Sequence, residues 1–461
     1  MRTPDSPDDK RGGEHASDVA EAIRAATRSE VRGALEGLIS GYHPIDIAFA
    51  MGELTADERS QVFELLDSDA SGIVLEEVDD RITADLAEST DEGELAEIID
   101  AMPPDSGADA MNVLPEDVKH RILNRIPAEE AEELAGLLDY SHETAGGLMT
   151  TEVLVSPPDI TAHDLLQHVR RTNVSPEAVF RVYVVDDDRR LLGAADLVDI
   201  INARDDQPLN KVMDRDPVRV HHDTDQEEVV RQVDKYDLTS IPVVDDDDHL
   251  LGAVTVDDVI DALQSEATED VGFMAGATIY DLQSRSPWGA ARSRIPWLLL
   301  SLLTGMLSVV VIRAFEGTLT EAVMLAAFMP IVLAMASNAG LQSSMVTVRA
   351  LALGFADARG AARMLWRQVP ASILVAIPCG LIASGAGVLI MREPSYGVIV
   401  GVGMFLAMSI GGTLGSAVPL ALNRLGVDPA IASGPLFTTL NDAIALLVYF
   451  GTAVALMQWL A

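Results

Sequence analysis

The chain contains 461 residues, of which 72 are acidic and 32 basic, and its formal net charge is −40 at pH 7. This length is typical of two to four domains. The charge argues against nucleic acid as a partner, because most of the surface would repel phosphates, and it favours cations.

The negative charge is concentrated in the first part of the chain. From Arg285 onward there are 10 basic and 6 acidic residues, whereas the 284 residues before it contain 22 basic and 66 acidic ones. Only four residues are lysine. Abundant carboxylates with scarce lysine are typical of a halophilic acidic surface, so each candidate site carboxylate needs its own argument.

Residues 1–28 are rich in Asp, Ser, Pro and Gly, which predicts a disordered acidic tail. They lack the apolar core of a signal peptide, so we expect the N-terminal part to be cytoplasmic. The single cysteine, Cys379, lies in an apolar run, which excludes an intrachain disulfide and argues against a cysteine-based metal site.

Residues 29–142 predict an all-α domain of repeated short helices. Three helices are expected to begin at prolines, in the stretches "MPPDSGADAM", "LPEDVKHRIL" and "IPAEEAEELAGLL", because proline suits the first helical turn. The stretch "DSDASGIVLEEV", Asp67 to Val78, begins like a calcium-binding EF-hand loop but ends on valine where a bidentate glutamate is required. We predict a loop between helices there.

An internal repeat follows, since residues 184–201 and 243–260 align without a gap. Each half predicts a strand, an acidic turn, a second strand ending in Leu-Leu-Gly, and a helix. The pattern resembles a tandem of α/β CBS domains, over residues 143–207 and 208–263. A helical pattern at residues 256–290 then predicts a connecting helix.

CBS domains often bind adenine nucleotides through a Gly-x-x-Thr-x-x-Asp pattern. The second half has it as Gly252, Thr255 and Asp258, whereas the first half keeps Asp199 but has Asp196 in the threonine position. The resemblance therefore leaves ATP binding open.

Residues 291–461 predict an α-helical membrane domain with five spans, because five nearly uncharged runs approach or exceed the roughly 20 residues that cross a bilayer. The runs are residues 295–312, 322–348, 369–391, 396–423 and 434–461. Arginine is concentrated before the first span and between the second and third, which places those segments in the cytoplasm and the C-terminus outside the plasma membrane.

Asp442 lies inside the last span, where an ionised carboxylate costs roughly 3 kcal/mol and normally faces a cavity, a partner charge or an ion. The alternative is a protonated carboxyl that hydrogen-bonds a neighbouring helix. Oxygen donors nearby favour a cation pathway for a hard ion such as Mg²⁺, which keeps its hydration shell. The candidates are Asn338, Gln342, Thr438, Thr439 and Ser337.

The domain order and the motifs "AGGLMT", "DTDQEEV", "VTVDDV", "EATEDV", "LGVDPA" and "PLxxTLxD" resemble the MgtE family of magnesium channels. The resemblance implies a homodimer in the lipid bilayer, with Asp442 at the ion site on the dimer axis and Asp428 at the cytosolic mouth. It also implies that cytosolic Mg²⁺, bound between the N domain, the CBS domains and the connecting helix, closes the pore. The implied regulatory ligands are Asp225, Glu227, Asp237, Asp257, Asp258, Asp261, Glu266, Glu269 and Asp270.

The pore motif departs from the family pattern at several places. Ala336 and Ser337 replace glycines, Gly434 stands where asparagine is common, and Ala445 replaces a glycine just after the aspartate. A transporter of another divalent cation, such as Co²⁺ or Mn²⁺, and an exporter coupled to an ion gradient therefore stay open. No nucleophile and base pairing, phosphate loop or zinc motif indicates an enzyme.

Overall fold

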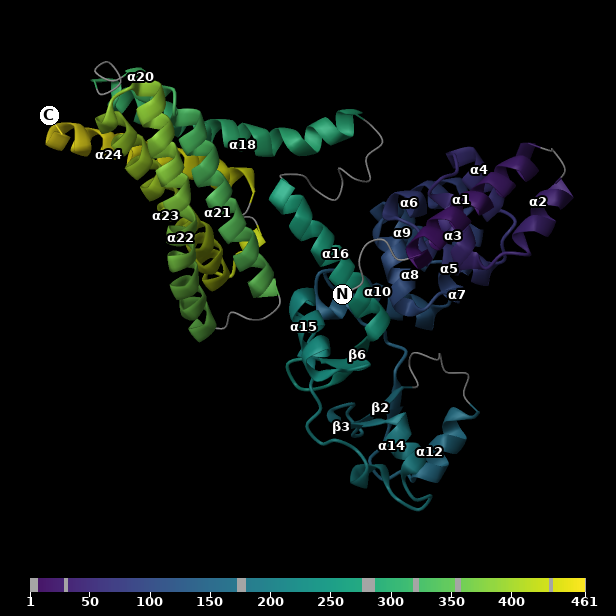
Figure 1. Ribbon diagram of the computed structural model, residues 1–461. Coiled ribbons are helices and arrows are strands. Elements are labelled where there is room, and N and C mark those ends of the chain that lie inside the picture. Colours follow the sequence, from purple (N-terminus) through teal and green to yellow (C-terminus); the bar gives the residue numbers. More distant parts are fainter. Residues whose placement is uncertain are drawn as a thin grey trace. The chain divides into compact units, whose positions relative to one another are not determined.

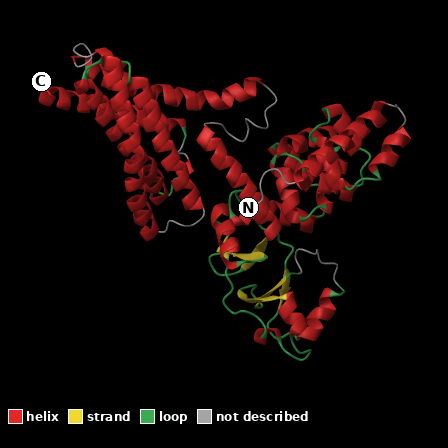
Figure 2. Cartoon of the chain, in the orientation of Figure 1, coloured by secondary structure: helices red, strands yellow, loops and turns green. Residues whose placement is uncertain are grey.

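The computed structural model describes residues 7–28, 32–171, 180–275, 287–317, 323–352, 358–430 and 434–460. The chain divides into two compact units, residues 1–262 and residues 263–461 (Figure 1). Within the described residues, strands occur in the first unit, and the second unit is helical (Figure 2). The predicted fold class, an all-α N domain, an α/β CBS tandem and a helical membrane domain, is confirmed.

The N-terminal part of the first unit is a stack of short helices. Helices α1, α3, α5, α7 and α9 pack in that succession, and α4 packs on α6. The helices are α1 (Pro7–Arg28), α2 (Arg32–Ile39), α3 (Pro44–Met51), α4 (Ala56–Phe63), α5 (Ser68–Glu77), α6 (Asp80–Ser89), α7 (Glu92–Ala101), α8 (Pro104–Asn112), α9 (Glu116–Leu123) and α10 (Ala128–Leu138).

The prolines at the starts of α8, α9 and α10 confirm the predicted helix boundaries. Pro104 is the first residue of α8, and Pro115 and Pro127 precede α9 and α10 as N-cap residues. At these positions a missing backbone N–H costs nothing, because the first N–H groups of a helix have no intrahelical partner.

Two predictions for this part were wrong. The disordered tail is a helix from residue 7, because Val19 and Ile23 lie one turn apart and are buried against the domain core. The predicted loop at residues 67–78 is also a helix, α5. Its first acid, Asp67, is the N-cap and accepts a hydrogen bond from the Ala70 N–H at 2.9 Å, so the feature that imitates a calcium loop is a helix cap.

The CBS tandem consists of two three-stranded sheets of the same topology. In each sheet the first strand pairs parallel with the second, and the second pairs antiparallel with the third. The first half contains α11 (Ala145–Leu148), β1 (Leu154–Ser156), α12 (Ala162–Val169), β2 (Arg181–Val185), β3 (Leu191–Asp196) and α14 (Leu197–Asn202). The second contains η1 (Leu209–Lys211), β4 (Val220–His221), α15 (Gln226–Tyr236), β5 (Ser240–Val244), β6 (Leu250–Thr255) and α16 (Val256–Ala275).

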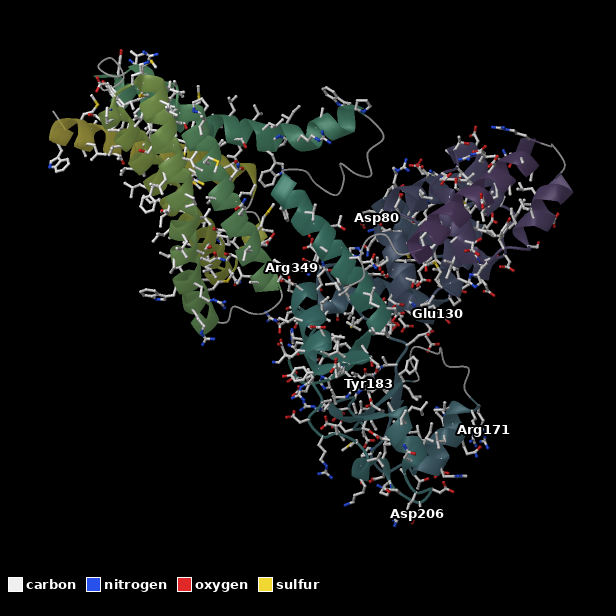
Figure 3. All side chains as sticks on the ribbon, in the orientation of Figure 1. Asp80, Glu130, Arg171, Tyr183, Asp206 and Arg349 are labelled. Atoms are coloured by element: carbon white, nitrogen blue, oxygen red, sulfur yellow. The ribbon has the colours of Figure 1, made fainter. Side chains whose placement is uncertain are left out.

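The strands β3 and β6 begin at Leu-Leu-Gly, which corrects the prediction that they end there. The two halves meet along a shared apolar cluster that includes Tyr183 and Leu250. The Tyr183 hydroxyl, buried on β2, lies 2.8 Å from Ser240 Oγ on β5 (Figure 3). The tandem is thus one packed body.

Helix α16 starts directly after β6 and continues to Ala275, as predicted for the connecting helix. Residues 276–286 of the predicted connecting helix lie outside the described residues, and residues 287–290 form the start of the next described helix.

The second unit contains, among the described residues, five helices long and apolar enough to cross a membrane, as predicted. They include α18 (Pro287–Ala314), α21 (Met329–Ala352), which follows the short α20 (Val323–Ala326), α22 (Ala358–Met391), α23 (Pro394–Arg424) and α24 (Pro435–Leu460). Helix α23 contacts α21, α22 and α24. Helices α21 and α23 meet at two glycines, since a Cβ on Gly415 would lie within 2.1 Å of the Gly340 carbonyl oxygen.

Candidate functional site

The carboxylate of Asp442 lies in the first third of α24 and faces α21. Ser337 Oγ on α21 donates a hydrogen bond to Asp442 Oδ1 at 2.5 Å, and Asn441 Nδ2 donates to Ser337 Oγ at 3.4 Å. Three polar side chains from two spans therefore form a connected chain that ends on the carboxylate. The close contact between Gly340 and Gly415 packs α21 tightly against α23. This packing fixes the position of Ser337, one turn before Gly340 on α21.

Asn441 is a member of this site that sequence reasoning missed. Its side chain is only 1% exposed, it lies against Gly411 of α23, and its Oδ1 has no hydrogen-bond partner among the described residues. An amide buried in a membrane span is costly unless something satisfies it. The available signal was its position directly before Asp442 in an otherwise apolar run.

The other predicted pore residues divide between two places. Asn338 and Gln342 lie one turn apart on α21, and both are exposed on the surface of this chain. Thr439 Oγ1 lies 2.7 Å from Thr304 Oγ1 on α18, and Thr438 is half-buried. The structure thus brings Ser337 to Asp442, whereas Asn338 and Gln342 form a separate polar strip.

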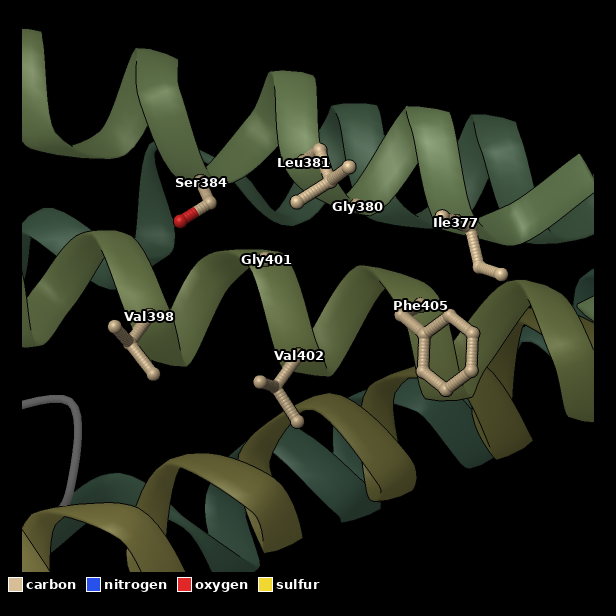
Figure 4. Close-up of a pocket in the computed structure, with 8 residues that line it drawn as sticks. All are labelled: Ile377, Gly380, Leu381, Ser384, Val398, Gly401, Val402 and Phe405. Atoms are coloured by element: carbon tan, nitrogen blue, oxygen red, sulfur yellow. The ribbon is translucent and has the colours of Figure 1, made fainter.

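Asp428 is exposed in the segment after α23, where its Oδ1 accepts a hydrogen bond from the Ala430 N–H at 2.7 Å. A groove between α22 and α23 has a different character, because it is almost wholly apolar (Figure 4). Small residues allow the two helices to approach there, and Leu381 and Phe405 are among its walls. This groove offers no ligands for a cation.

A second cluster of carboxylates lies inside the first unit, between the N domain and the first turns of α16. Glu76 of α5 and Asp105 of α8 come from the N domain, and Asp257, Asp258 and Asp261 come from α16. We call these five residues the acidic cluster. Sequence reasoning found the three α16 residues and missed Glu76 and Asp105, whose proximity depends on the packing of the N domain.

Burial, and after it neighbouring carboxylates, raise the pKa values of four members of the acidic cluster, Glu76, Asp105, Asp258 and Asp261. Burial raises the pKa of Asp258 to about 7, opposed by the hydrogen bond from Thr255 and reinforced by Asp105. Burial raises the pKa of Asp105 to about 6, and Asp109 and Glu76 add to the shift. The pKa of Glu76 rises for the same reasons, with Asp257 and Asp261 among its neighbours. The raised pKa values reflect the cost of keeping these carboxylates ionised when they are partly buried and close to one another, a cost that a bound cation would lower.

Asp105 provides a further sign of an unsatisfied site. Its Oδ1 is buried and has no hydrogen-bond partner among the described residues. A buried carboxylate oxygen without a donor is normally neutralised by a proton, a cation or an ordered water. The acidic cluster therefore offers oxygen ligands of the kind that Mg²⁺ prefers.

The remaining predicted regulatory acids lie outside this cluster. Asp225 is the N-cap of α15 and accepts a hydrogen bond from the Glu227 N–H at 3.0 Å, and Asp237 ends the same helix in a left-handed conformation. All three side chains are exposed. Glu266 and Glu269 lie further along α16, past the end of the first unit, and the side chain of Asp270 lies outside the described residues.

The residues of the nucleotide pattern have local structural partners. A Cβ on Gly252 would lie 2.3 Å from the Thr150 carbonyl oxygen, so only glycine on β6 allows the backbone at Thr150 to approach this closely. The Thr255 hydroxyl donates to Asp258 Oδ2, and Asp199 is exposed on α14. Asp258 thus belongs to both the nucleotide pattern and the acidic cluster.

Five helices long and apolar enough to cross a membrane, with oxygen donors around one carboxylate, and a CBS tandem rich in carboxylates, fit the class of membrane cation transporters. The MgtE family model, described as a divalent cation transporter, matches residues 329–452. The MgtE intracellular N domain matches residues 42–143, and the CBS domain matches residues 145–206 and 209–265.

Known proteins of the same kind resemble most of the chain. The magnesium transporter MgtE of Enterococcus faecalis is 36% identical over 333 residues, which is 72% of this chain and 73% of that protein. The magnesium transporter MgtE of Thermus thermophilus is 34% identical over 340 residues, covering 73% of this chain and 75% of that one. The chain therefore belongs to the MgtE family, as the sequence motifs predicted.

A solved structure supports the assignment for the first unit. The crystal structure of the cytosolic domain of the Mg²⁺ channel MgtE in complex with ATP is 32% identical, with a TM-score of 0.50. The match covers 52% of the present chain and 99% of the solved chain.

Proposed function

We propose that this protein is a homodimeric, Mg²⁺-selective channel that imports magnesium across the plasma membrane and is closed by cytosolic Mg²⁺. The observation that carries the proposal is Asp442, a carboxylate within a span whose hydrogen-bond partners are a hydroxyl and, through it, an amide. No basic side chain is among the partners of Asp442 in the described residues, so a cation is the natural source of compensating charge.

Homodimer formation is supported by the polar strip of α21. Asn338 and Gln342 are exposed within a span, where contact with lipid would leave two amides without hydrogen-bond partners. A second copy of the chain that faces this strip would enclose a wet pathway lined by both subunits. Two Asp442 carboxylates, one from each subunit, would then face the same ion.

The oxygen donors at this site favour a hard cation. Ser337, Asn338 and Gln342 offer hydroxyl and amide oxygens, which suit Mg²⁺ better than the softer transition metals. Because Mg²⁺ loses its water reluctantly, these neutral groups would bind the hydrated ion through its water shell while Asp442 supplies the charge.

The cytosolic part would act as the sensor. Mg²⁺ bound at the acidic cluster would hold α16 against the N domain by removing the repulsion between Glu76, Asp105 and the three aspartates of α16. The exposed acids Asp225, Glu227 and Asp237, and Glu266, Glu269 and Asp270 further along α16, would add sites of lower occupancy. At low cytosolic Mg²⁺ the same repulsion would release α16 and open the pore.

The topology follows from charge. Arg349, Arg363 and Arg367 lie between the second and third spans, which supports a cytoplasmic location for that segment and for the N-terminal unit. Five spans then place the C-terminus outside. ATP is proposed as a second ligand of the CBS tandem, at Gly252, Thr255 and Asp258, by analogy with the ATP-bound cytosolic domain.

The test is magnesium flux into liposomes that contain purified protein. Asp442→Asn keeps the size of the side chain and removes one charge per subunit, so flux should fall by about 100-fold or more while the dimer stays intact. The matched control is Glu393→Gln, the same loss of charge at the exposed start of α23. Near-normal flux in a well-folded Asp442→Asn dimer would falsify the pore assignment, and competition by Co²⁺, Mn²⁺ and Ca²⁺ in the same assay tests selectivity.

A further inference from the structure

The second CBS domain contains a cluster of imidazole and carboxylate groups that the magnesium proposal does not use. His221, His222 and Asp223 follow one another at the end of β4, and one ligand atom from each lies within 4.8 Å of the others. Among the described residues, this is the group with histidine ligands at metal-binding spacing.

The imidazole nitrogens of this cluster face carboxylate oxygens without being hydrogen-bonded to them. His222 Nδ1 lies 2.9 Å from Asp223 Oδ1, and His221 Nε2 lies 3.0 Å from Asp246 Oδ1 in the turn between β5 and β6. Both nitrogens are inaccessible to water, and neither has a well-aligned hydrogen-bond partner among the described residues. Two shielded nitrogens next to two carboxylates are an arrangement that a cation satisfies better than a proton does.

The backbone that carries the two histidines is fixed by hydrogen bonds on both sides. The His222 N–H donates to the Val244 carbonyl at 3.1 Å, and its carbonyl accepts from the Gly146 N–H at 2.8 Å. The His221 N–H donates to Thr224 Oγ1 at 3.1 Å. Because the backbone is held, binding a ligand at this cluster requires only small side-chain movements.

We propose that His221, His222 and Asp223 bind one divalent transition metal of the Zn²⁺ class, and that Asp246, whose Oδ1 lies 3.0 Å from His221 Nε2, moves in as the fourth ligand. Imidazole nitrogen is a preferred ligand for Zn²⁺, Ni²⁺ and Cu²⁺ and a poor one for Mg²⁺, so this site discriminates against the ion that the acidic cluster would bind. In a tetrahedral zinc site the ligand atoms lie about 3.3 Å apart, which is close to the two nitrogen–oxygen distances observed. Ligand atoms within the His221, His222 and Asp223 group lie up to 4.8 Å apart, so binding would draw their side chains together.

The consequence of occupancy is a cross-link within the second CBS domain. The metal would join the end of β4 to the turn between β5 and β6, two segments that the sheet already places side by side. Its position two residues before Asp225, the N-cap of α15, would tie the start of that helix to the sheet. Zinc-class metals would therefore stabilise the tandem independently of magnesium transport.

The experiment uses the full-length protein in detergent, stripped of metal and dialysed against Zn²⁺ in the presence of excess Mg²⁺. The wild type should retain one Zn²⁺ per chain. The double variant His221→Gln with His222→Gln should bind Zn²⁺ about 100-fold more weakly, and Asp246→Asn about tenfold more weakly. Co²⁺ in place of Zn²⁺ should give the intense visible absorption of a tetrahedral site in the wild type only.

The matched control replaces two histidines of the first CBS domain, His163→Gln with His168→Gln on α12. This variant should keep full Zn²⁺ affinity, and both double variants should keep wild-type magnesium flux, which shows that they are folded. Equal Zn²⁺ binding by the His221/His222 variant and the wild type would overturn the proposal. So would displacement of Zn²⁺ from the wild type by excess Mg²⁺.

Discussion

The two carboxylate sites of this protein differ in how many charges they contain and in what surrounds them. In the membrane unit, Asp442 is a single carboxylate with a serine and an asparagine behind it. In the first unit, five carboxylates lie near one another at the acidic cluster, and burial raises the pKa values of Glu76, Asp105, Asp258 and Asp261. In a low-dielectric span, one carboxylate per subunit is enough to attract a dication, whereas a partly hydrated interface needs several.

Under the proposed function, Asp442 would be a site for passage and the acidic cluster a site for sensing. A pore must release its ion, so one carboxylate with neutral neighbours is appropriate. A sensor must respond to a concentration, and mutual repulsion of several acids gives a large difference between the empty and the occupied state. The predictions that follow test whether this division is real.

The largest effect is expected from neutralising the sensor. Replacing Asp257, Asp258 and Asp261 together by Asn should leave magnesium flux intact at low Mg²⁺ and abolish its inhibition by cytosolic Mg²⁺, because the repulsion that Mg²⁺ relieves is gone. Patch recordings with varied cytosolic Mg²⁺ measure this. Inhibition that persists in the triple variant would mean that these acids are ordinary halophilic surface.

A similar but smaller change is expected from the N-domain side of the same cluster. Glu76→Gln with Asp105→Asn should raise the Mg²⁺ concentration for half-inhibition by about tenfold, because two of the five ligand carboxylates are lost. The control is Glu129→Gln, the same loss of charge at an exposed position of α10 outside the cluster. Equal inhibition curves for the double variant and the wild type would remove the N domain from the sensor.

Replacing the residues that hydrogen-bond toward Asp442 should reduce magnesium flux less than removing the Asp442 charge does. Asn441→Leu removes the donor to Ser337, and Ser337→Ala removes the donor to Asp442, so each should reduce flux by about tenfold through misplacement of Asp442. Because they act along one chain of hydrogen bonds, the double variant should be no worse than the worse single variant. Additive losses, measured as flux per dimer, would contradict this chain.

The pH dependence distinguishes the two sites further. Asp258, with its pKa near 7, must lose a proton to bind Mg²⁺, so the Mg²⁺ affinity of the sensor should fall as pH drops from about 8 to about 6. Asp105, Glu76 and Asp261, whose pKa values are also raised, should add to the effect. Calorimetry in buffers of different ionisation enthalpy counts the protons released, and Asp258→Asn should release fewer.

The same pKa shifts predict how the metal-free protein responds to pH. Between the unfolded pKa of 3.8 and the folded pKa of about 7, the folded state holds a proton on Asp258 that the unfolded state has lost. Stability should therefore decrease as pH rises through this window, and Mg²⁺ should restore it at about pH 8. Thermal melts at several pH values with and without Mg²⁺ test this, and a melting temperature that rises with pH in metal-free protein would contradict it.

The smallest effect is expected at the N-cap of α5, the end of that helix opposite to Glu76. Asp67→Ala should cost about 1 kcal/mol of stability, because the Ala70 N–H loses its acceptor. Calcium should not alter the melting temperature of the wild type or of this variant at a constant Mg²⁺ concentration. A calcium-dependent shift lost in Asp67→Ala would restore the EF-hand interpretation.

Features set by local pattern could be predicted from the sequence. Hydropathy predicted the five spans, and the gapless repeat predicted the two CBS sheets. The cost of a buried charge drew attention to Asp442, whose role in the pore stays a prediction. Proline predicted the starts of α8, α9 and α10. In these cases the determining interactions lie within one helix, one hairpin or one bilayer thickness.

Features that depend on tertiary packing could not be predicted from the sequence. The helix at residues 7–28 is stabilised by burial of Val19 and Ile23 against other helices, whereas its composition alone predicts disorder. Glu76 lies 182 residues before Asp258 in the chain, and only the packing of α5 and α8 against α16 brings their charges together. Asn441 was missed because its neighbour Asp442 carried the obvious charge.

Helix α16 begins at the residue that follows β6, with no loop between strand and helix. Because no loop residues lie between them, α16 should tilt as a rigid rod about the end of β6. Twenty residues of helix span about 30 Å, so a tilt of about 5° at the sheet displaces the far end by about 2.6 Å. Sub-ångström movements of the carboxylates at the start of α16 would thus become displacements several times larger at its far end. If the acidic cluster binds Mg²⁺ as proposed, the stiffness of α16, and not affinity alone, would set the smallest change in Mg²⁺ that the protein detects.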